Sequence, residues 1–204
     1  MMRLRCAADV TLADLGTIIT GRTPPSDKAE CFGGTCPFIT PSDMIGQKYI
    51  RATARYLSAD GRALLHRCIV PAGSVTVSCI GWQMGKAAMV DRDSVTNQQL
   101  NTVVTNSRVD AHFLYYSLSV RREELKRLGS VGTRTPIVNK SVFSGLRVKL
   151  PPLSEQRRIS GILSAYDNLI ENCERRIRVL EEATRALYRE WFVNFRYPGH
   201  AEAS

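Results

Sequence analysis

Between Ile159 and Trp191, mostly apolar residues recur at alternating steps of four and three positions. A repeat of about 3.5 residues that lasts for several heptads forms one stripe along an α-helix, and such a stripe needs a partner helix along its length. We therefore predict a coiled-coil helix, and pairing with another chain is favoured over folding back onto its own domain. The predicted seam consists of Ile159, Leu163, Tyr166, Ile170, Cys173, Ile177, Leu180, Thr184, Leu187 and Trp191.

The sequence before the heptads has a different pattern. Residues 69–80 are rich in β-branched side chains around a Pro-Ala-Gly turn, and residues 111–128 have the spacing of a helix with one apolar face. Pro151 and Pro152 end this part, because proline does not extend a strand ladder and disfavours a helical predecessor. We predict an α+β chain with a mixed α/β domain of short strands at residues 1–152, a long coiled-coil helix at 153–197 and a tail at 198–204.

The net charge of +9 belongs to the first part of the chain. Residues 1–153 contain 20 Lys and Arg against 11 Asp and Glu, whereas residues 154–197 contain 8 against 7. A basic domain of this size favours a polyanion, most often nucleic acid, because its side chains neutralise phosphates and release counterions. The alternative is a basic protein without such a ligand.

The six cysteines are scattered and lack the spacing of a disulfide framework. Cys31 and Cys36 are separated by four residues, but no second ligand pair accompanies them, so we predict no metal site. No run of residues has the character of a signal peptide or a membrane span, and a reducing cytoplasm is the expected location. The sequence also contains no motif that we assign to a catalytic centre.

The segment from Gly81 to Ala87 partly matches a phosphate-binding loop. Only three residues separate its glycines, and Ala87 replaces the hydroxyl that would hold magnesium, so nucleotide binding is not predicted. A loop between two glycines that carries Trp82, Gln83 and Lys86 is suited to DNA, because Gln pairs with adenine and Lys reaches a phosphate or a guanine. The alternative is an ordinary β-hairpin turn with surface residues.

Two further loops, at residues 21–24 and 132–136, combine a glycine, an arginine and threonine hydroxyls. Glycine allows the backbone to approach a phosphate, and arginine offers a forked donor to phosphate or guanine. The Asn-Gln-Gln sequence at residues 97–99 can contact base edges or can hold loops to the core through its amides. For these three residues we favour the structural role.

Taken together, these segments resemble the specificity subunit of type I restriction-modification systems, and the resemblance covers nearly the whole chain. It rests on the order and spacing of short motifs. The last motif runs directly into the heptads, as a target recognition domain of this family runs into its spacer helix. The motifs lie at residues 15–16, 20–24, 37–39, 69–75, 85–87, 97–99, 132–134 and 150–156.

Members of this family usually carry two recognition domains and two spacer helices, whereas this sequence contains one of each. The resemblance therefore implies a half-length form that pairs with a second copy through its helix. Two antiparallel copies would contact identical, inverted half-sites separated by a gap, so a homodimer is expected to prefer an interrupted palindrome. The alternative is a recognition cassette that pairs with a different half subunit, which would make the DNA target asymmetric.

The resemblance also implies that the chain is not an enzyme but supplies double-stranded DNA recognition to other subunits. A modification subunit would methylate adenine with S-adenosylmethionine, and a restriction subunit, where present, would add translocation and cleavage driven by ATP with Mg. No cofactor is expected in this chain itself. The residues predicted to contact DNA are Arg22, Thr23, Gln83, Lys86, Thr133 and Arg134.

A helix of about 60 Å would then set the distance between the half-sites. Two alternatives from other classes remain. The chain could be a stand-alone coiled-coil DNA-binding regulator or orphan recognition cassette without a methylase partner, which co-purification with a modification subunit would distinguish. It could also be an enzyme whose active site is not recognisable in the sequence. Activity of the isolated chain with S-adenosylmethionine would reveal such a site.

Overall fold

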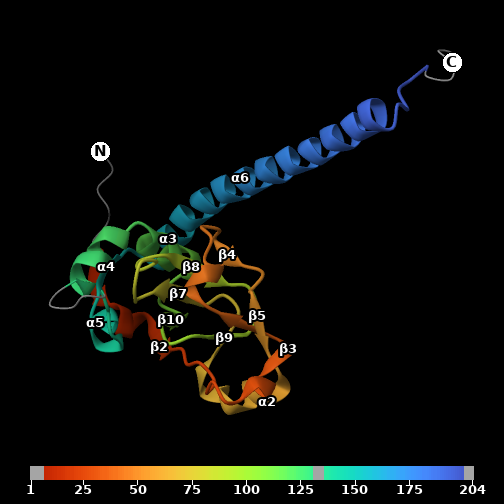
Figure 1. The fold of residues 1–204 in the computed structure, drawn as a ribbon. Coiled ribbons are helices and arrows are strands. Elements are labelled where there is room, and N and C mark those ends of the chain that lie inside the picture. Colours follow the sequence, from red (N-terminus) through yellow and green to blue (C-terminus); the bar gives the residue numbers. More distant parts are fainter. Residues whose placement is uncertain (1–6, 131–135, 200–204) are drawn as a thin grey trace. The chain divides into compact units, whose positions relative to one another are not determined.

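A computed structural model describes residues 7–130 and 136–199, and it confirms a mixed α/β fold of short strands with a long C-terminal helix (Figure 1). The strands are β1 Ala8–Thr11, β2 Gly16–Thr20, β3 Phe32–Ile39, β4 Tyr49–Ile50, β5 Arg55–Leu57, β6 Ile69–Val70, β7 Val75–Ser78, β8 Ala87–Val90, β9 Ser94–Thr96, β10 Leu100–Thr105 and β11 Arg147–Leu150. The α-helices are α1 Leu12–Leu15, α2 Ala59–Leu64, α3 Ala111–Ser119, α4 Arg122–Gly129, α5 Lys140–Ser144 and α6 Leu153–Tyr188.

The strands form two main sheets and one small pair. The five-stranded sheet has the order β2-β10-β7-β8-β4, and all its neighbours are antiparallel except β4 and β8. The four-stranded sheet has the order β5-β3-β9-β6, while β1 pairs with β11. Because β1 and β11 lie near opposite ends of the domain sequence, their pairing closes the domain immediately before α6.

The register of the five-stranded sheet brings several distant loops to one end. Thr20 at the end of β2 lies opposite Asn101, and Ser78 at the end of β7 lies opposite Leu100. Ala87 at the start of β8 pairs with the last part of β7, and β4 runs parallel to β8. The connections that follow β2 and β7 and those that precede β4, β8 and β10 therefore leave the sheet at the same end, which we call the loop end.

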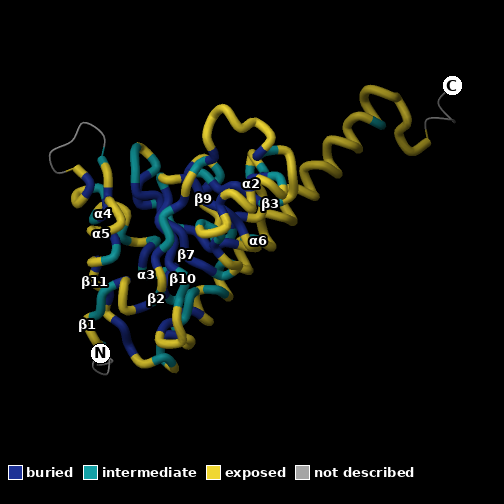
Figure 2. The backbone as a smooth tube through the Cα atoms, turned by 90° about the horizontal axis from the view of Figure 1, so that it is seen from below, coloured by how far each residue is buried: buried dark blue, intermediate teal, exposed yellow. Residues whose placement is uncertain are grey.

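Alternating side chains of the strands supply separate hydrophobic cores on the two faces of the five-stranded sheet. One core joins this sheet to α1, α3, α4, α5 and β11, and it includes Leu15, Val77, Met89, Val103, Leu114, Leu118, Leu125, Phe143 and Val148. A second core includes Ile39, Met44, Val70, Ala88, Val90 and Leu100. Phe38, Leu57, Leu65 and Val95 form a third cluster at the four-stranded sheet. Burying each large apolar side chain contributes roughly 1.5–3 kcal/mol, so these cores stabilise the sheets that carry the loop end. Figure 2 shows the buried residues along the central strands.

The predicted helix over residues 111–128 is divided into α3 and α4. The helical path is interrupted at Arg121, which has φ −100° and ψ 19°. The Arg121 guanidinium donates to the carbonyl of Arg147 at 2.7 Å and to both oxygens of Glu124. These bonds tie the junction to β11 and to the first turn of α4, which favours a new helix start over a continuous helix. Val120 at the break is strongly exposed.

The long helix begins at Leu153, the first residue of the helix predicted from the sequence. Its 36 residues span about 54 Å, and a π-helical turn at Arg189–Val193 follows, short of the predicted end at residue 197. By its contacts the chain divides within α6 into a unit of residues 1–160 and a unit of residues 161–204. Among the residues described, no helix has the length and apolar character needed to cross a bilayer.

Candidate nucleic-acid interface

The predicted loop after β2 is fixed to the connection between β9 and β10. A Cβ atom on Gly21 would lie 2.2 Å from the carbonyl oxygen of Thr96, so only glycine allows this approach. The backbone N–H of Arg22 donates to the same carbonyl at 2.9 Å, and the Thr23 hydroxyl donates to the side-chain oxygen of Gln98. These bonds fix the backbone of the loop, while the side chain of Arg22 stays exposed at the loop end.

The Asn-Gln-Gln segment at the loop end acts mainly within the protein. The side-chain oxygen of Asn97 accepts from the backbone N–H of Gln99 at 3.1 Å, and its NH2 group donates to the Gln99 side chain at 3.0 Å. The carbonyl of Gln99 accepts from the N–H of Cys79 at 2.8 Å. This geometry agrees with the structural role that we favoured, and it joins the connection before β10 to the end of β7. Gln98 is exposed.

The connection between β7 and β8 is a closed turn. Gly81 and Gly85 have φ values of 78° and 81°, which L side chains rarely adopt. The N–H of Met84 donates to the carbonyl of Gly81 at 3.0 Å, and the N–H of Gly85 donates to Ser78 at 2.8 Å. The Met84 side chain is fully buried. The turn is thus anchored on the core while Trp82, two residues earlier, points into solvent.

Gln83 and Lys86, the residues of this turn that we predicted to contact DNA, differ in their surroundings. The ammonium of Lys86 donates to the carbonyl oxygen of Met44 at 2.8 Å, which holds the connection before β4 at the loop end. The side-chain oxygen of Gln83 is shielded from solvent and has no hydrogen-bond donor within residues 7–130 and 136–199. A Lys86 side chain that links two loops has less freedom to reach a phosphate than Arg22. The DNA contacts of Gln83 and Lys86 stay predictions.

Thr133 and Arg134 lie outside the described residues. The residues on both sides of them are placed, however, at the turn between β7 and β8. The N–H of Ile137 donates to the carbonyl of Gly129 at 3.0 Å, and the N–H of Gly81 donates to the carbonyl of Pro136 at 3.1 Å. The structure therefore brings the three predicted loops, or their flanking residues, to one end of the sheet, although they are separated by up to about 110 positions in the sequence.

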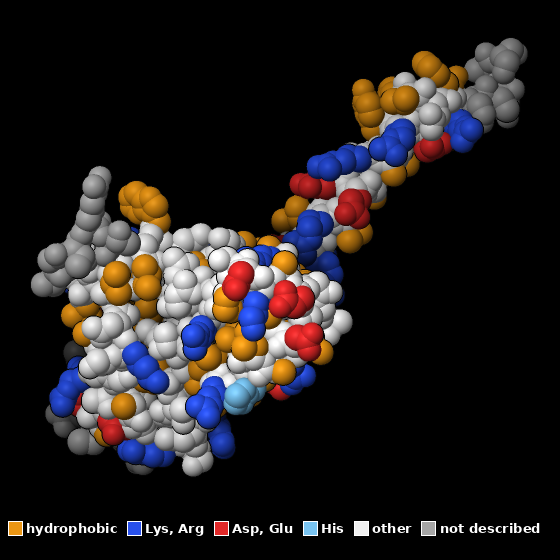
Figure 3. Space-filling model, turned by 60° about the horizontal axis from the view of Figure 1, so that its bottom comes forward, with side chains coloured by type: hydrophobic (Ala, Val, Ile, Leu, Met, Phe, Trp, Pro, Cys, Tyr) orange, Lys and Arg blue, Asp and Glu red, His pale blue; other side chains and the backbone are white. Residues whose placement is uncertain are grey.

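The electrostatics of this region suit a polyanion. Arg122 in α4 is exposed, and its Nε donates to the carbonyl of Met84 at 3.3 Å, which places a cation beside the turn. A hydrogen bond from Lys126 lowers the pKa of Glu123, so this carboxylate is charged at neutral pH and offsets one of the nearby cations. Figure 3 shows Lys and Arg side chains spread over one face of the unit of residues 1–160, with fewer Asp and Glu side chains among them.

The interior of the candidate interface offers no activated nucleophile among the groups whose pKa is shifted. Burial raises the pKa of the Cys79 thiol to about 11, so this thiol is neutral at physiological pH. In the described ranges, no three His, Cys, Asp or Glu side chains gather as they would around a metal ion. The arrangement presents an arginine, amides and an indole on a fixed support, which is suited to binding.

Sequence reasoning missed two features of the loop end. Arg122 approaches the turn because α4 begins after an interruption that the helical pattern did not reveal. Ile45, which is 73% exposed, lies directly after the residue whose carbonyl holds Lys86. The sequence signals were weak: an isoleucine directly before a glycine, and two adjacent arginines inside an apolar helical pattern.

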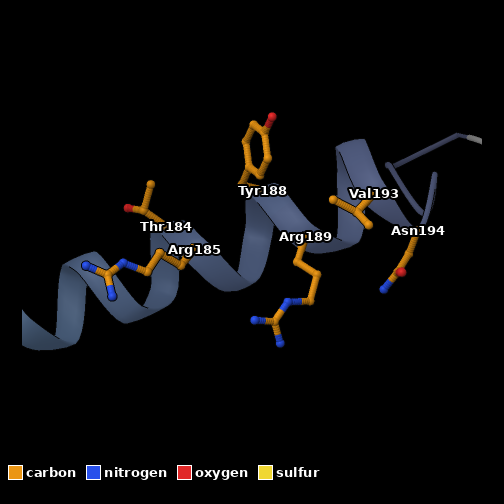
Figure 4. Close-up of a pocket in the computed structure, with 6 residues that line it drawn as sticks. All are labelled: Thr184, Arg185, Tyr188, Arg189, Val193 and Asn194. Carbon is orange, nitrogen blue, oxygen red and sulfur yellow. The ribbon is translucent and has the colours of Figure 1, made fainter.

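The predicted seam of α6 forms a second candidate surface. Tyr166 and Leu180 are 62% and 66% exposed, and Figure 2 shows exposure along most of the helix. At the end of the arm, Tyr188 and Arg189 project from different sides of the helix (Figure 4). A helix with this many exposed apolar side chains marks an interaction site. The exposed large side chains of the seam are Leu163, Tyr166, Ile170, Ile177, Leu180, Leu187 and Trp191.

Comparisons with known proteins agree with this arrangement. Residues 7–182 match the protein family described as Type I restriction modification DNA specificity domain. The chain is 35% identical over 168 residues to the Type I restriction enzyme HindI specificity subunit of Haemophilus influenzae, an alignment that covers 79% of this chain and 36% of that protein. It is 28% identical over 193 residues to the Type I restriction enzyme MjaIX specificity subunit of Methanocaldococcus jannaschii, covering 90% of this chain and 43% of that protein.

Among solved structures, the S subunit of a type I restriction-modification system from M. genitalium has a TM-score of 0.67 at 16% sequence identity. This match covers 91% of our chain and 46% of the other, and at this identity it shows a common fold. The chain spans less than half the length of the curated relatives that it matches.

Proposed function

We propose that this chain, which belongs to the family of type I restriction-modification DNA specificity domains, recognises one half of a bipartite DNA target. The observation that carries this proposal is the family match over residues 7–182, which includes both the loop end and most of the helical seam. The loop end would contact double-stranded DNA, and the seam would assemble the complex. In this role the chain binds and positions DNA and performs no catalytic step.

The proposed assembly is a homodimer. The described residues form one loop end and one seam, and a seam that is exposed over several heptads is stabilised when another helix covers it. A second copy supplies a helix with the same repeat, so two chains can bury both seams at once. If the helices are antiparallel, the dimer contacts two identical half-sites in opposite orientation, and the target is an interrupted palindrome.

The proposed partners supply the chemistry. A modification subunit would bind S-adenosylmethionine and methylate the DNA, and a restriction subunit, where the cell has one, would use ATP and Mg. Arg22 is our first candidate for DNA contact in the described residues because it is exposed at the loop end. Thr23 is the second, because its hydroxyl is bonded to the exposed Gln98. Gln83, Lys86, Thr133 and Arg134 complete the proposed set.

The mass of the purified chain in solution tests the assembly. A homodimer has twice the mass of the 22.7 kDa chain in light scattering, and a modification subunit co-expressed with it should co-purify. Ile170→Asp combined with Ile177→Asp places two charges in the seam and should yield a monomer. Asn172→Asp, an exposed position between the seam residues, is the matched control and should stay dimeric.

DNA recognition is tested by enrichment from a library of randomised duplexes. The proposal expects an enriched sequence with two inverted halves separated by a gap of fixed length. An asymmetric target would indicate that the chain pairs with a different half subunit and not with a second copy of itself. A monomer that binds neither duplex DNA nor a modification subunit would overturn the proposed function.

A further inference from the structure

Trp82 is 95% exposed, more than any other large apolar side chain in the described residues. An indole combines a large apolar surface with a polar N–H, and tryptophan is enriched where a protein surface contacts a partner. Trp82 belongs to a turn of the unit of residues 1–160 and not to the seam, so pairing of two seams does not by itself account for its exposure. Its exposure requires a reason of its own.

The turn that carries Trp82 is held in a single shape. The N–H of Gly81 donates to the carbonyl of Pro136 at 3.1 Å, and the N–H of Gly85 donates to the carbonyl of Ser78 at 2.8 Å. Between these anchors the side chain of Met84 is buried against Gly129, where a Cβ atom would lie 2.7 Å from the methionine methyl. Because the backbone of the turn is fixed on both sides of Trp82, little backbone entropy is lost when a ligand covers the ring.

The charges around the turn indicate the kind of ligand. The Nε of Arg122 is bonded to the carbonyl of Met84, and Arg22 is exposed on a neighbouring loop at the same end of the sheet. Exposed arginines at the same end of the sheet as an exposed aromatic ring suit a ligand that is polyanionic and can also offer flat apolar faces. Duplex DNA is a polyanion, and its base faces become accessible where a base step is opened.

We propose that Trp82 contacts the bases of duplex DNA directly, with its indole acting as a wedge or stacking platform at a base step. This inference rests on the proposed DNA-binding function and adds a specific residue to it. Apolar side chains inserted at a base step partly unstack it, and stacking on an aromatic ring tolerates any base. Trp82 therefore adds affinity that does not depend on salt, while Arg22 adds affinity that does.

Tryptophan emission of the full-length chain provides the first test. The protein contains two tryptophans, so Trp191→Phe leaves Trp82 as the only one and keeps an aromatic ring in the seam. The probe is the duplex that the unmodified protein enriches from the randomised library. Adding this duplex should quench the emission of Trp82 and should protect the indole from quenching by iodide.

Substitutions measure what the contact contributes. Trp82→Ala should weaken binding of the enriched duplex by about 5- to 150-fold, and Trp82→Phe should retain most of the affinity. The slope of log affinity against log salt should be unchanged in Trp82→Ala but should decrease by about 1 in Arg22→Ala, which removes a charge. Leu64→Ala, at a partly exposed leucine of α2, is the matched control and should bind as the unmodified protein does.

The outcomes separate this inference from the function on which it rests. If the unmodified protein binds the duplex while Trp82 emission and the affinity of Trp82→Ala are unchanged, the indole does not contact the bases and only this inference fails. If Trp82→Ala instead loses binding to the modification subunit and keeps DNA affinity, the ring belongs to a protein interface and the inference is again wrong. If no duplex is enriched or bound, both proposals fail.

Discussion

The function of a polar side chain at the loop end depends on whether its terminal group is already hydrogen-bonded within the protein. The ammonium of Lys86 donates to the carbonyl of Met44, so we expect Lys86→Met to destabilise the fold by roughly 1–2 kcal/mol, because this substitution removes a charged hydrogen bond and leaves a carbonyl without its donor. Urea unfolding of the full-length chain measures this change. Lys28→Met, at an exposed position after β2, should alter stability by less than about 0.5 kcal/mol. An unfolding midpoint shared by both variants would show that the Lys86 bond does not stabilise the loop.

Cys79 provides a pH-dependent prediction. Burial raises the pKa of its thiol from 9.0 to about 11, so above pH 9 the unfolded chain loses this proton while the folded chain keeps it. The stabilising contribution is complete below pH 9 and is lost as the pH rises towards 11, amounting to roughly 1–3 kcal/mol. Other groups titrate in this range, so the test is the difference in unfolding free energy between the unmodified protein and Cys79→Ala. A difference that does not change between pH 8 and pH 10.5 would contradict the prediction.

At the scale of single residues, the sequence indicates the chemistry of the interface better than its geometry. Glycine, arginine and threonine in two short loops predicted phosphate or base contact, and the structure places the described members or their neighbours at one end of a sheet. The bond from Lys86 to Met44 joins residues 42 positions apart and depends on the parallel pairing of β4 with β8. No local pattern encodes this pairing, so the structural role of Lys86 was not predictable from its loop.

At the scale of elements, the start of α6 is fixed by one buried amide. Gln156 is 1% exposed, and its side chain accepts from the N–H of Asp110 at 2.8 Å and donates to the carbonyl of Pro151 at 2.8 Å. Gln156→Leu fills similar space but leaves these buried groups unpaired, which should destabilise residues 1–160 by roughly 2–4 kcal/mol. Thermal or urea unfolding measures the loss. Arg157→Ala, one position along on the exposed side, should have little effect. Equal stability of the two variants would show that the amide does not anchor the helix.

Helical elements were predictable where one periodicity runs without interruption. The heptads between Ile159 and Trp191 predicted α6 because the same step recurs many times, and the β-branched residues of 69–80 predicted β6 and β7. The interruption between α3 and α4 was missed because the apolar spacing continues across it, whereas Arg121 bonds to a distant strand. The order of the strands was also beyond the sequence, since β2, β10 and β7 are adjacent in space and far apart along the chain.

At the scale of the whole molecule, the mixed α/β fold with its long helix was predictable because two unlike patterns divide the sequence at Pro151 and Pro152. The prediction of a half-length form came from counting one recognition domain and one helix, and the chain covers less than half the length of the relatives that it matches. The bases of the target were not predictable, because they depend on side chains at the loop end whose positions follow from strand register. Under the proposed pairing, by contrast, the length of the target gap would depend on a single element, α6.

If two copies pair through antiparallel arms, the length of α6 sets the distance between the half-sites. Duplicating residues 174–180 adds one heptad, keeps the seam continuous and lengthens each helix by about 10 Å. Because both arms lengthen over the same stretch, the gap in the duplex enriched by this variant should grow by about three base pairs at 3.4 Å per step, with unchanged half-sites. Duplicating residues 174–178 instead shifts the seam out of register and should abolish the dimer. A dimeric heptad variant that enriches the original gap would show that the helix does not act as the ruler.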